Sequence, residues 1–189
     1  MENDKQVYLR RFTTDIEDLE DYFTITGDEK VMVASGVKPC ESYMDSCKRL
    51  RKIIEKDISM AIVLKKTERV IGTITFQPDL HRVNKRATML GYELAQSYWG
   101  NGYMAQAVEI ALGYAFERQK SMIVSVSHFV QNQRSQRVIE KVGFTYEGTL
   151  RQEFVRFDNR VFDSRVYSMT REEYDEKYRT ISYDDVRIY

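Results

Sequence analysis

A six-residue stretch, Tyr98-Trp99-Gly100-Asn101-Gly102-Tyr103, has the residue types and spacing to hold a phosphate group. Its two glycines allow a tight turn that brings successive backbone N–H groups close to an anion. An amphipathic helix is predicted to start directly after the turn, and the positive end of a helix dipole favours negative charge. We therefore expect the loop to bind a phosphorylated ligand, whose identity depends on the residues around it.

A dinucleotide is one candidate, since Gly100-x-Gly102-x-x-Ala105 satisfies the glycine fingerprint of dinucleotide-binding folds. Those folds also require an acidic residue about 20 positions further on, which holds a ribose. The segment there reads Lys120-Ser121-Met122-Ile123 and has no acidic side chain. A predicted meander of strands also precedes the loop, where the dinucleotide fold requires repeated strand-helix-strand units. The context therefore disfavours a dinucleotide oxidoreductase.

The loop resembles instead the pyrophosphate loop of the GNAT acetyltransferases, which reads Gln or Arg, two residues, Gly, any residue, then Gly or Ala. The segment from Ser97 to Gly102 fits, with serine in place of the usual first residue. Main-chain N–H groups hold most of such a ligand, so this departure is tolerable. The phrase from Tyr98 to Tyr103 is similar to the Rim-type branch, the ribosomal-protein N-terminal acetyltransferases and their relatives. That branch commonly has a glutamate where Gln106 stands.

A second block supports the resemblance: Asn132-x-x-Ser135-x-x-Val138-Ile139-Glu140-Lys141-Val142-Gly143-Phe144. It resembles the fourth-helix signature of the same family, and two motifs in the right order are more specific than one. The resemblance covers residues 6–178. It implies an α/β fold, with a mixed central sheet flanked by helices and a splayed fourth and fifth strand. We expect one N-acetyltransferase domain over residues 1–189, with a short polar C-terminal tail.

The resemblance implies acetyl-CoA as cosubstrate and an amine as acceptor, joined by direct attack in a ternary complex. Splayed-strand backbone groups, by position those of Glu93, Leu94 and Ala95, would bind the pantetheine arm. The Leu94 N–H is also the candidate donor to the developing oxyanion. The expected cofactor-binding residues are Leu94, Ala95, Trp99, Gly100, Asn101, Gly102, Tyr103, Met104 and Asn132.

Two side chains are candidates for acid–base chemistry. Glu93 lies near a strand end just before the loop, where a carboxylate can accept a proton from the amine, directly or through water. The alternative is an exposed strand-end charge. Ser135 shares a helix face with Val138, Ile139 and Val142, so its hydroxyl points inward and can protonate or orient the thiolate. The alternative is a hydroxyl bonded to its own helix.

Other residues are weaker candidates. Many GNAT members have a tyrosine general acid where this chain has Ile139, so that role does not transfer. Asn132 opens a helix and can cap it as well as contact the cofactor. His128 titrates in the right range but follows a strand, where packing is the commoner role. The following residues are expected to pack or to carry surface charge: Tyr98, Trp99, Asp158, Asp163, Tyr174 and Tyr178.

Composition excludes several other classes. The 29 basic and 29 acidic residues create no global field that would attract nucleic acid or an anionic membrane. Two cysteines and two histidines without a close cluster predict no metal site. Cys40 and Cys47, on one predicted helix, would lie about 10 Å apart, so both are expected to be reduced. The absence of a leader or a long apolar run predicts a cytoplasmic protein without a membrane span.

Hydrophobic periodicity and turn signals place the elements along the chain. A capping box is expected at Thr14–Glu17, another at Thr170–Glu173, and a loop around Gly27–Gly36. Strands are predicted at Val7–Phe12, Met60–Leu64, Val70–Phe76, Ala87–Leu94, Met122–Val126, Phe144–Glu147, Arg151–Phe157 and Val161–Met169. Helices are predicted after Thr14, at Pro39–Lys56, Tyr103–Arg118 and Asn132–Val142, and after Thr170.

The sequence thus predicts an acetyl-CoA-dependent N-acetyltransferase acting on a primary amine. A catalytically silent module that binds CoA as a sensor or scaffold is the alternative. The acceptor stays open between a protein or peptide N-terminus, a polyamine and an antibiotic amine, because the predicted acceptor loops carry both charge signs. The oligomeric state also stays open, although homodimers are common in the resembling branch.

Overall fold

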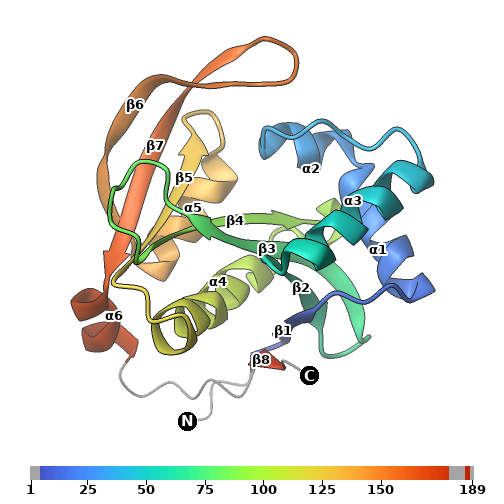
Figure 1. Cartoon of the computed structure of the whole chain (residues 1–189), viewed down its shortest axis with the longest axis horizontal. Helices are drawn as coiled ribbons and strands as arrows, with labels where there is room; N and C mark the ends of the chain where they lie inside the picture. The colour runs from blue at the N-terminus through green and yellow to red at the C-terminus, as the bar shows by residue number, and fades with distance from the viewer. Residues whose placement is uncertain (1–4, 179–185, 188–189) are drawn as a thin grey trace.

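An eight-stranded mixed β-sheet forms the centre of the molecule (Figure 1). The structure, a computed structural model, describes residues 5–178 and 186–187. The strands lie in the order β6-β7-β5-β4-β3-β2-β1-β8. They are β1 (Val7–Arg11), β2 (Ser59–Leu64), β3 (Arg69–Pro78), β4 (Ala87–Leu94), β5 (Ile123–Phe129), β6 (Thr145–Val155), β7 (Val161–Thr170) and β8 (Val186–Arg187). The helices are α1 (Ile16–Thr26), α2 (Glu29–Ala34), α3 (Tyr43–Lys56), α4 (Tyr103–Gly113), α5 (Gln133–Val142) and α6 (Arg171–Tyr178).

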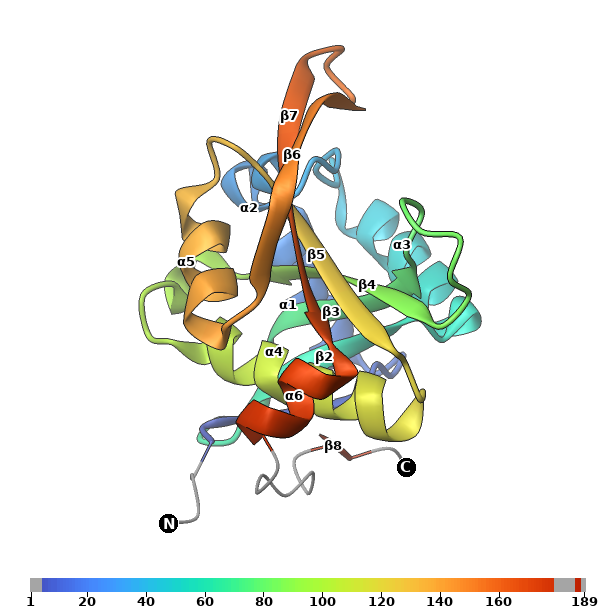
Figure 2. The ribbon, with the colours of Figure 1, turned by 90° about the vertical axis from the view of Figure 1, so that its left-hand side faces the viewer.

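Two hydrophobic cores lie on opposite faces of this sheet. Side chains alternate along a strand, so Val7 and Leu9 of β1 join the core beneath α4 while Tyr8 joins the core beneath α1. Every residue of β2 is buried, which explains its uninterrupted apolar run. Helices α1, α2 and α3 cover one face, and α4 and α5 cover the other (Figures 1 and 2). The site elements are therefore fixed by packing from both sides.

Most of the predicted elements are confirmed, as is the α/β architecture with a mixed central sheet flanked by helices. Strand β4 runs from Ala87 to Leu94 as expected, and α5 ends at Gly143, whose φ of 94° is left-handed. The capping box before α6 is present, because the Thr170 N–H donates to Glu173 and the Glu173 N–H donates to the Thr170 hydroxyl. The predicted helix from Tyr103 is also present, but its last turn, Tyr114–Arg118, is π-helical.

The region between α1 and α3 differs from the prediction. The segment expected to be a loop contains α2, whose first N–H groups donate to the Asp28 side chain. The chain therefore has three helices between β1 and β2 where the sequence indicated two. Helix α3 begins at Tyr43 rather than Pro39, with Ser42 as its cap. Cys40 consequently precedes α3 and does not share it with Cys47, although both thiols are free and buried.

Two further predictions are wrong in detail. No capping box joins Thr14 to Glu17, because α1 begins after Asp15 without a side-chain cap bond. The two segments predicted near the C-terminus form one long strand, β6, whose pairing with β7 shifts at Gly148 and again before Phe154. These irregularities let one strand bend where the hydrophobic pattern suggested a break. The resulting β6–β7 hairpin extends past the rest of the molecule (Figure 2).

Strands β4 and β5 separate as the family resemblance implied. Their parallel pairing covers Ala87–Leu90 and Ile123–Val126 only. Strand β4 continues to Leu94 while paired with β3 on its other edge. Among the described residues, the edge of β4 that faces β5 therefore has no strand partner after Leu90, and a gap opens through the sheet.

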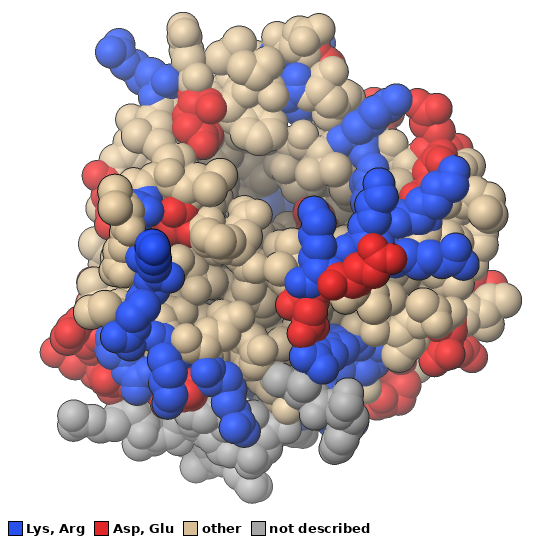
Figure 3. All heavy atoms as spheres, in the orientation of Figure 1, with Lys and Arg blue, Asp and Glu red and all other residues tan. Residues whose placement is uncertain are grey.

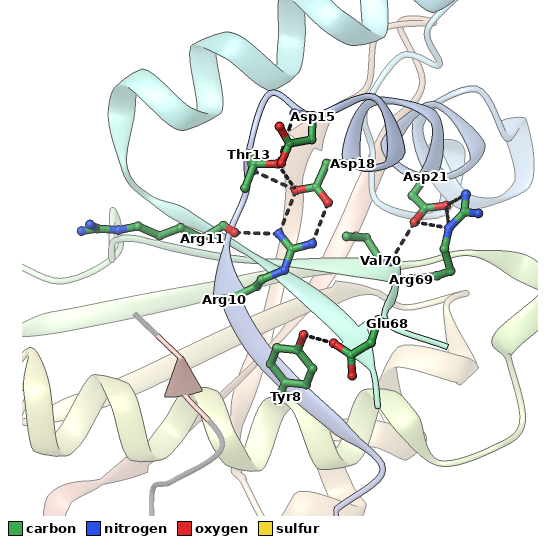
Figure 4. Close-up of polar contacts among 10 residues, drawn as sticks. All are labelled: Tyr8, Arg10, Arg11, Thr13, Asp15, Asp18, Asp21, Glu68, Arg69 and Val70. Carbon is green, nitrogen blue, oxygen red and sulfur yellow. Dashed lines mark hydrogen bonds and ion pairs between the residues drawn. The ribbon is translucent and has the colours of Figure 1, made fainter. Parts of the chain in front are cut away.

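Helix α1 is tied to the sheet by buried carboxylates (Figure 4). Arg10 of β1 donates to both oxygens of Asp18, at 2.8 and 2.6 Å, and the Thr13 N–H adds a third bond at 2.8 Å. Asp21 accepts bonds from the Arg69 guanidinium and, at 2.8 Å, from the Val70 N–H of β3. These bonds stabilise the charges that burial would otherwise penalise, and they hold α1 in place.

We predict that Asp18→Asn lowers the free energy of unfolding by about 2 kcal/mol, because it leaves the partly buried Arg10 without its charge partner. Burial raises the pKa of Asp18, but the bonds from Arg10 and Thr13 outweigh it and keep the pKa below its ordinary value. This contribution is present above the unfolded pKa of about 3.9 and is lost as the pH falls through the folded pKa. Urea unfolding from pH 7 to pH 3 measures it. Asp57→Asn, which breaks an exposed pair with Arg11, is the control and should change stability by less than about 0.5 kcal/mol.

Candidate active site

The predicted phosphate loop joins the end of β4 to the start of α4. Gly100 and Gly102 have φ values of 83° and 77°, in the left-handed region that favours glycine. A Cβ at Gly100 would meet no atom of the described part of the chain within 4 Å, so the backbone there leaves room for a ligand. Gly102 precedes α4, and no side chain caps this helix end. The first N–H groups of α4 are therefore free to bind an anion.

Three cations of α5 line the same cavity as this loop. Arg134, Arg137 and Lys141 recur at three- and four-residue spacing, so they share one helix face. The Lys141 Nζ lies 3.8 Å from the position of a Cβ on Gly102. The Arg134 guanidinium lies over the Trp99 ring, 4.3 Å from its centre. Together with the helix end, these cations concentrate positive charge in this part of the cavity, which suits an anionic ligand.

The cavity measures about 910 Å³ and passes from this loop through the gap between β4 and β5. On the far side it is lined by Val31, Ala34 and Ser35 near α2, and by Glu153 and Phe154 of the β6–β7 hairpin. Figure 3 shows its mouth on that side as a hollow with a mostly uncharged rim. A ligand that enters from the loop and one that enters from this mouth can therefore meet at the gap.

The backbone of β4 decides which amides face the gap. The Ala95 N–H donates to the Ile71 carbonyl of β3, 2.9 Å away, so the prediction of a free Ala95 amide is wrong. The backbone N–H groups of successive residues point alternately to the two edges of a strand. The N–H groups of Tyr92 and Leu94 therefore point to the other edge, toward β5. The Leu94 carbonyl is already used, since it accepts a 2.8 Å bond from the Trp99 indole. This bond also fixes the loop against the strand end.

Ser135 meets Tyr92 on the α5 side of the gap. The two hydroxyl oxygens lie 2.7 Å apart, and burial raises the pKa of Tyr92, which keeps its proton. The Ser135 N–H donates to the Asn132 side chain at 3.2 Å, which confirms Asn132 as the cap of α5. The amide nitrogen of Asn132 also donates to the Ala34 carbonyl, and this bond links α5 to α2. The serine is thus held at the cavity wall with a second hydroxyl behind it.

Glu93 lies on the opposite face of the sheet, toward α1 and α3. Its carboxylate accepts a short hydrogen bond from the Thr73 hydroxyl. Burial raises the pKa of Glu93 above its ordinary value, against the Thr73 bond and the positive charge of Arg49, which lower it. Glu93 is therefore no exposed strand-end charge. It lines the same cavity as Ser135, and the two are reached from opposite sides of the gap.

Comparison with known protein families agrees with this geometry. A model described as acetyltransferase (GNAT) domain matches residues 6–145. The chain belongs to the GNAT acetyltransferase family. This membership, with relatives named as N-acetyltransferases, confirms the predicted enzyme class and the predicted fold. It overturns the dinucleotide oxidoreductase, and it favours an enzyme over a silent CoA-binding module.

Individual proteins similar to this chain are also named as acetyltransferases. The uncharacterized N-acetyltransferase YoaA of Bacillus subtilis (strain 168) is 27% identical over 176 residues, which cover 90% of this chain and 96% of that protein. The crystal structure of spermidine N-acetyltransferase from Vibrio cholerae in complex with CoA and spermine has a TM-score of 0.73 and 20% identity, with 89% and 98% of the chains covered. Ribosomal-protein-S5-alanine acetyltransferase from Vibrio fischeri has a TM-score of 0.68 and 20% identity, with 89% and 94% covered.

The acetyltransferase brings most of its predicted site residues to one cavity. The predicted residues that line it are Glu93, Leu94, Trp99, Gly100, Gly102, Tyr103, Met104, Asn132 and Ser135. Ala95 and Asn101 do not line it. The Asn101 amide donates to the carbonyls of Tyr98 and Trp99, so this side chain shapes the loop.

The remaining candidates have packing or hydrogen-bond contacts, and of these His128 and Tyr98 also line the cavity. His128 is 5% exposed, its Nδ1 lies 2.8 Å from the Phe129 carbonyl oxygen, and its ring stacks on Tyr167. Burial lowers the pKa of His128, so it is neutral at pH 7. Asp158 pairs with Arg156, and Asp163 accepts the Gln152 N–H in the hairpin. The predicted packing residues Tyr98, Trp99, Tyr174 and Tyr178 all join a hydrophobic core.

Sequence reasoning missed the three α5 cations, Tyr92 and the hairpin residue Glu153. The signal for the cations was their helical spacing in the second motif. Tyr92 was detectable only as the neighbour of Glu93 on the other face. Nothing in the sequence indicated that Glu153 would reach the cavity, since the path of the hairpin depends on its two register shifts.

The described part of the chain contains neither a candidate metal site nor a helix that could span a membrane. Among residues 5–178 and 186–187, no group of three or more His, Cys, Asp or Glu side chains could hold a metal ion. In the same residues no helix has the length and apolar character to cross a bilayer.

We predict that Lys141→Gln weakens CoA binding about fivefold, because one cation beside the loop contributes about 1 kcal/mol to phosphate binding. Isothermal titration calorimetry with CoA at low and high salt measures the effect, which should shrink as salt screens the charge. Lys66→Gln, at an exposed turn between β2 and β3, is the matched control. Equal affinities of the two variants would show that Lys141 does not face the phosphates.

Proposed function

We propose that this enzyme transfers the acetyl group of acetyl-CoA to a primary amine by direct attack in a ternary complex. One observation carries the proposal. Ser135 and Glu93, an acid candidate and a base candidate, open into a single cavity from opposite faces of the sheet, at the gap between β4 and β5. Two substrates that enter from opposite sides would react there without a covalent enzyme intermediate.

The residues present fit the CoA part of the cosubstrate. Left-handed glycines, an uncapped helix end and the cations of α5 suit its phosphates. The outward N–H groups of Tyr92 and Leu94 suit an extended arm with amide groups, since such an arm pairs with a strand edge as another strand does. When bound, acetyl-CoA supplies an acetyl thioester and a thiolate leaving group. Gly100 leaves room for close approach because it has no Cβ.

Different side chains at the gap take part in the two proton transfers of the reaction. Glu93 accepts a proton from the attacking amine, and its raised pKa makes it a better acceptor than an exposed carboxylate. The Leu94 N–H stabilises negative charge on the acetyl oxygen. Ser135 donates a proton to the departing sulfur, and the Tyr92 hydroxyl, 2.7 Å away, can replace it. The residue at position 139 is a buried isoleucine and takes no part.

Charge in the cavity favours a cationic acceptor. The Lys and Arg side chains among its described lining residues all come from α5, at the loop end. Glu93 and Glu153 lie toward the other mouth. An ammonium group is attracted to such a surface, whereas a carboxylate is repelled. Within this amine class we infer a Rim-type acceptor, a protein or peptide N-terminus or a small amine, in line with the named activities of the two structural neighbours. A cytoplasmic location and a homodimer stay predictions from the sequence.

Release of free thiol from acetyl-CoA, measured against a panel of N-terminal peptides, diamines and monoamines, tests the activity. At least one cationic amine should accelerate release, with acetylated amine formed in equal amount. Hydrolysis of acetyl-CoA without amine dependence, over the whole panel, would contradict the proposal.

We predict that Glu93→Gln lowers kcat/KM for the amine about 100- to 1,000-fold at pH 7, because the general base is lost. Acetyl-CoA affinity should stay within about twofold, since the carboxylate lies on the acceptor side. In the wild type, kcat/KM should fall as the pH drops through a pKa above the ordinary glutamate value of about 4.3. If the Glu93→Gln variant retained this acidic limb, the limb would belong to another group.

We predict that Ser135→Ala lowers kcat about 10- to 100-fold, while KM for the amine changes little, because proton donation to the thiolate concerns only the transition state. Ser135→Thr keeps a hydroxyl at this position and should retain most of the activity. Rapid-quench measurement of the first turnover separates this chemical step from product release. Equal losses in the two variants would point to packing rather than proton transfer.

A further inference from the structure

A second, smaller cavity of about 130 Å³ lies behind Glu93, between α1, α3 and β3. Its polar lining comes from Tyr22, Thr26, Arg49, Thr73, Thr75 and Glu93. Glu93 is the residue that also lines the large cavity. Glu93 therefore lies between two cavities, the large one proposed to receive the substrates and this smaller one, which polar and apolar side chains line together.

Arg49 of α3 lies beside this smaller cavity, and only one of its two terminal guanidinium nitrogens has a hydrogen-bond partner among the described residues. The Nη2 atom donates to the Lys38 carbonyl, 2.9 Å away. The Nη1 atom is buried and has no hydrogen-bond partner among the described residues. A buried N–H group without a partner costs free energy, so such a group next to a polar cavity indicates bridging water. The volume is sufficient for water molecules that join Nη1 to the other polar groups.

The other groups that line the smaller cavity or bond to Glu93 cannot supply a positive charge. Tyr22 of α1 is buried, and burial raises its pKa, so it stays neutral. Ser35 beyond α2, and Thr73 and Thr75 of β3, offer hydroxyl groups. Within the described part of the chain, Arg49 is the cation among the groups that line this cavity.

A general base at this position must meet two opposing requirements, a high affinity for a proton and an ionised state at pH 7. Burial raises the pKa of Glu93 and so increases its affinity for a proton, but a carboxylate that is protonated at pH 7 cannot act as a base. A cation fully bonded to the carboxylate would depress the pKa and weaken the base. A cation that acts across a small wet cavity stabilises the ionised form to an intermediate degree.

We propose that Arg49 is a positioning residue that keeps the Glu93 carboxylate ionised and directed at the acceptor amine, acting through water in the smaller cavity. This inference rests on the proposed function, in which Glu93 is the base. The ammonium first loses one proton to solvent, and the neutral amine nitrogen then bonds to the acetyl carbon and passes a second proton to Glu93. The C–S electron pair leaves with the sulfur, which takes the Ser135 proton. Ser135 regains a proton from solvent, directly or through the Tyr92 hydroxyl, and Glu93 releases its proton to solvent, so that one acetylated amine, one free thiol and two released protons less the one returned to Ser135 balance the reaction.

The pH dependence of kcat/KM for the amine tests the proposal in Arg49→Gln and Arg49→Lys. In Arg49→Gln the midpoint of the acidic limb should rise by about one pH unit, so that kcat/KM falls about tenfold below the limb and stays near wild type above it. Arg49→Lys should restore most of the shift, because it retains the charge. Arg51→Gln, an exposed position on the same helix, is the matched control and should leave the profile unchanged. A uniform loss at every pH, with an unshifted midpoint, would overturn the proposal.

A second measurement does not depend on turnover. The ¹³C carboxyl resonance of Glu93, assigned by its loss in Glu93→Gln, can be titrated by NMR in the wild type and in Arg49→Gln. The Glu93 pKa should be about one unit higher in Arg49→Gln, and equal values would refute the role of Arg49. If no amine is acetylated, the proposed function fails, but this titration still decides whether Arg49 controls the ionisation of Glu93.

Discussion

The parallel pairing of β4 with β5 ends after four residue pairs, and the site depends on this separation. A strand inside a sheet normally has partners on both edges, and backbone groups without partners are costly when buried. Beyond Leu90 the outward N–H groups of β4 face a cavity instead of a strand. The fold thus presents a strand edge that a ligand can complete, at the place where the sheet can be crossed.

Packing on both faces keeps this gap open. The strands next to it, β4 and β5, pack into the core beneath α4 through Leu90, Leu94, Val124 and Val126, and the neighbouring strands β1, β2 and β3 are also packed against the core beneath α1. The Trp99 indole binds the Leu94 carbonyl and packs against both cores, so the phosphate loop cannot move independently of the strand end. The bonds of Asp18 and Asp21 fix α1, which forms one wall of the cavity behind Glu93. A rigid frame of this kind places reacting groups without a large entropy cost at each turnover.

Positive and negative side chains lie at opposite ends of the cavity. The cations of α5 gather at the loop, where the helix end already favours anions, while Glu93 and Glu153 lie toward the other mouth. In the proposed reaction, such a division would guide each substrate to its own entrance and disfavour binding in the reverse direction. It also separates Glu93 from the α5 cations, so that the nearby cation is the partly bonded Arg49. Burial, the Thr73 hydrogen bond and the charge of Arg49 act together on the proton affinity of Glu93.

Features that depend on local geometry could be predicted from the sequence alone. The glycines of the loop, the start of α4 at Tyr103 and the Asn132 cap of α5 follow from backbone and capping rules that act over a few residues, and β4 followed from its apolar run. The same rules failed at α2, whose six residues are too few for a periodic pattern, and at β6, where bulges interrupt the alternation. Tertiary structure alone decided which β4 amides are free, that Tyr92 stands behind Ser135 and that Arg49 faces Glu93. Those relations join residues more than 40 positions apart, or depend on which edge of a strand is paired, and no local pattern encodes either.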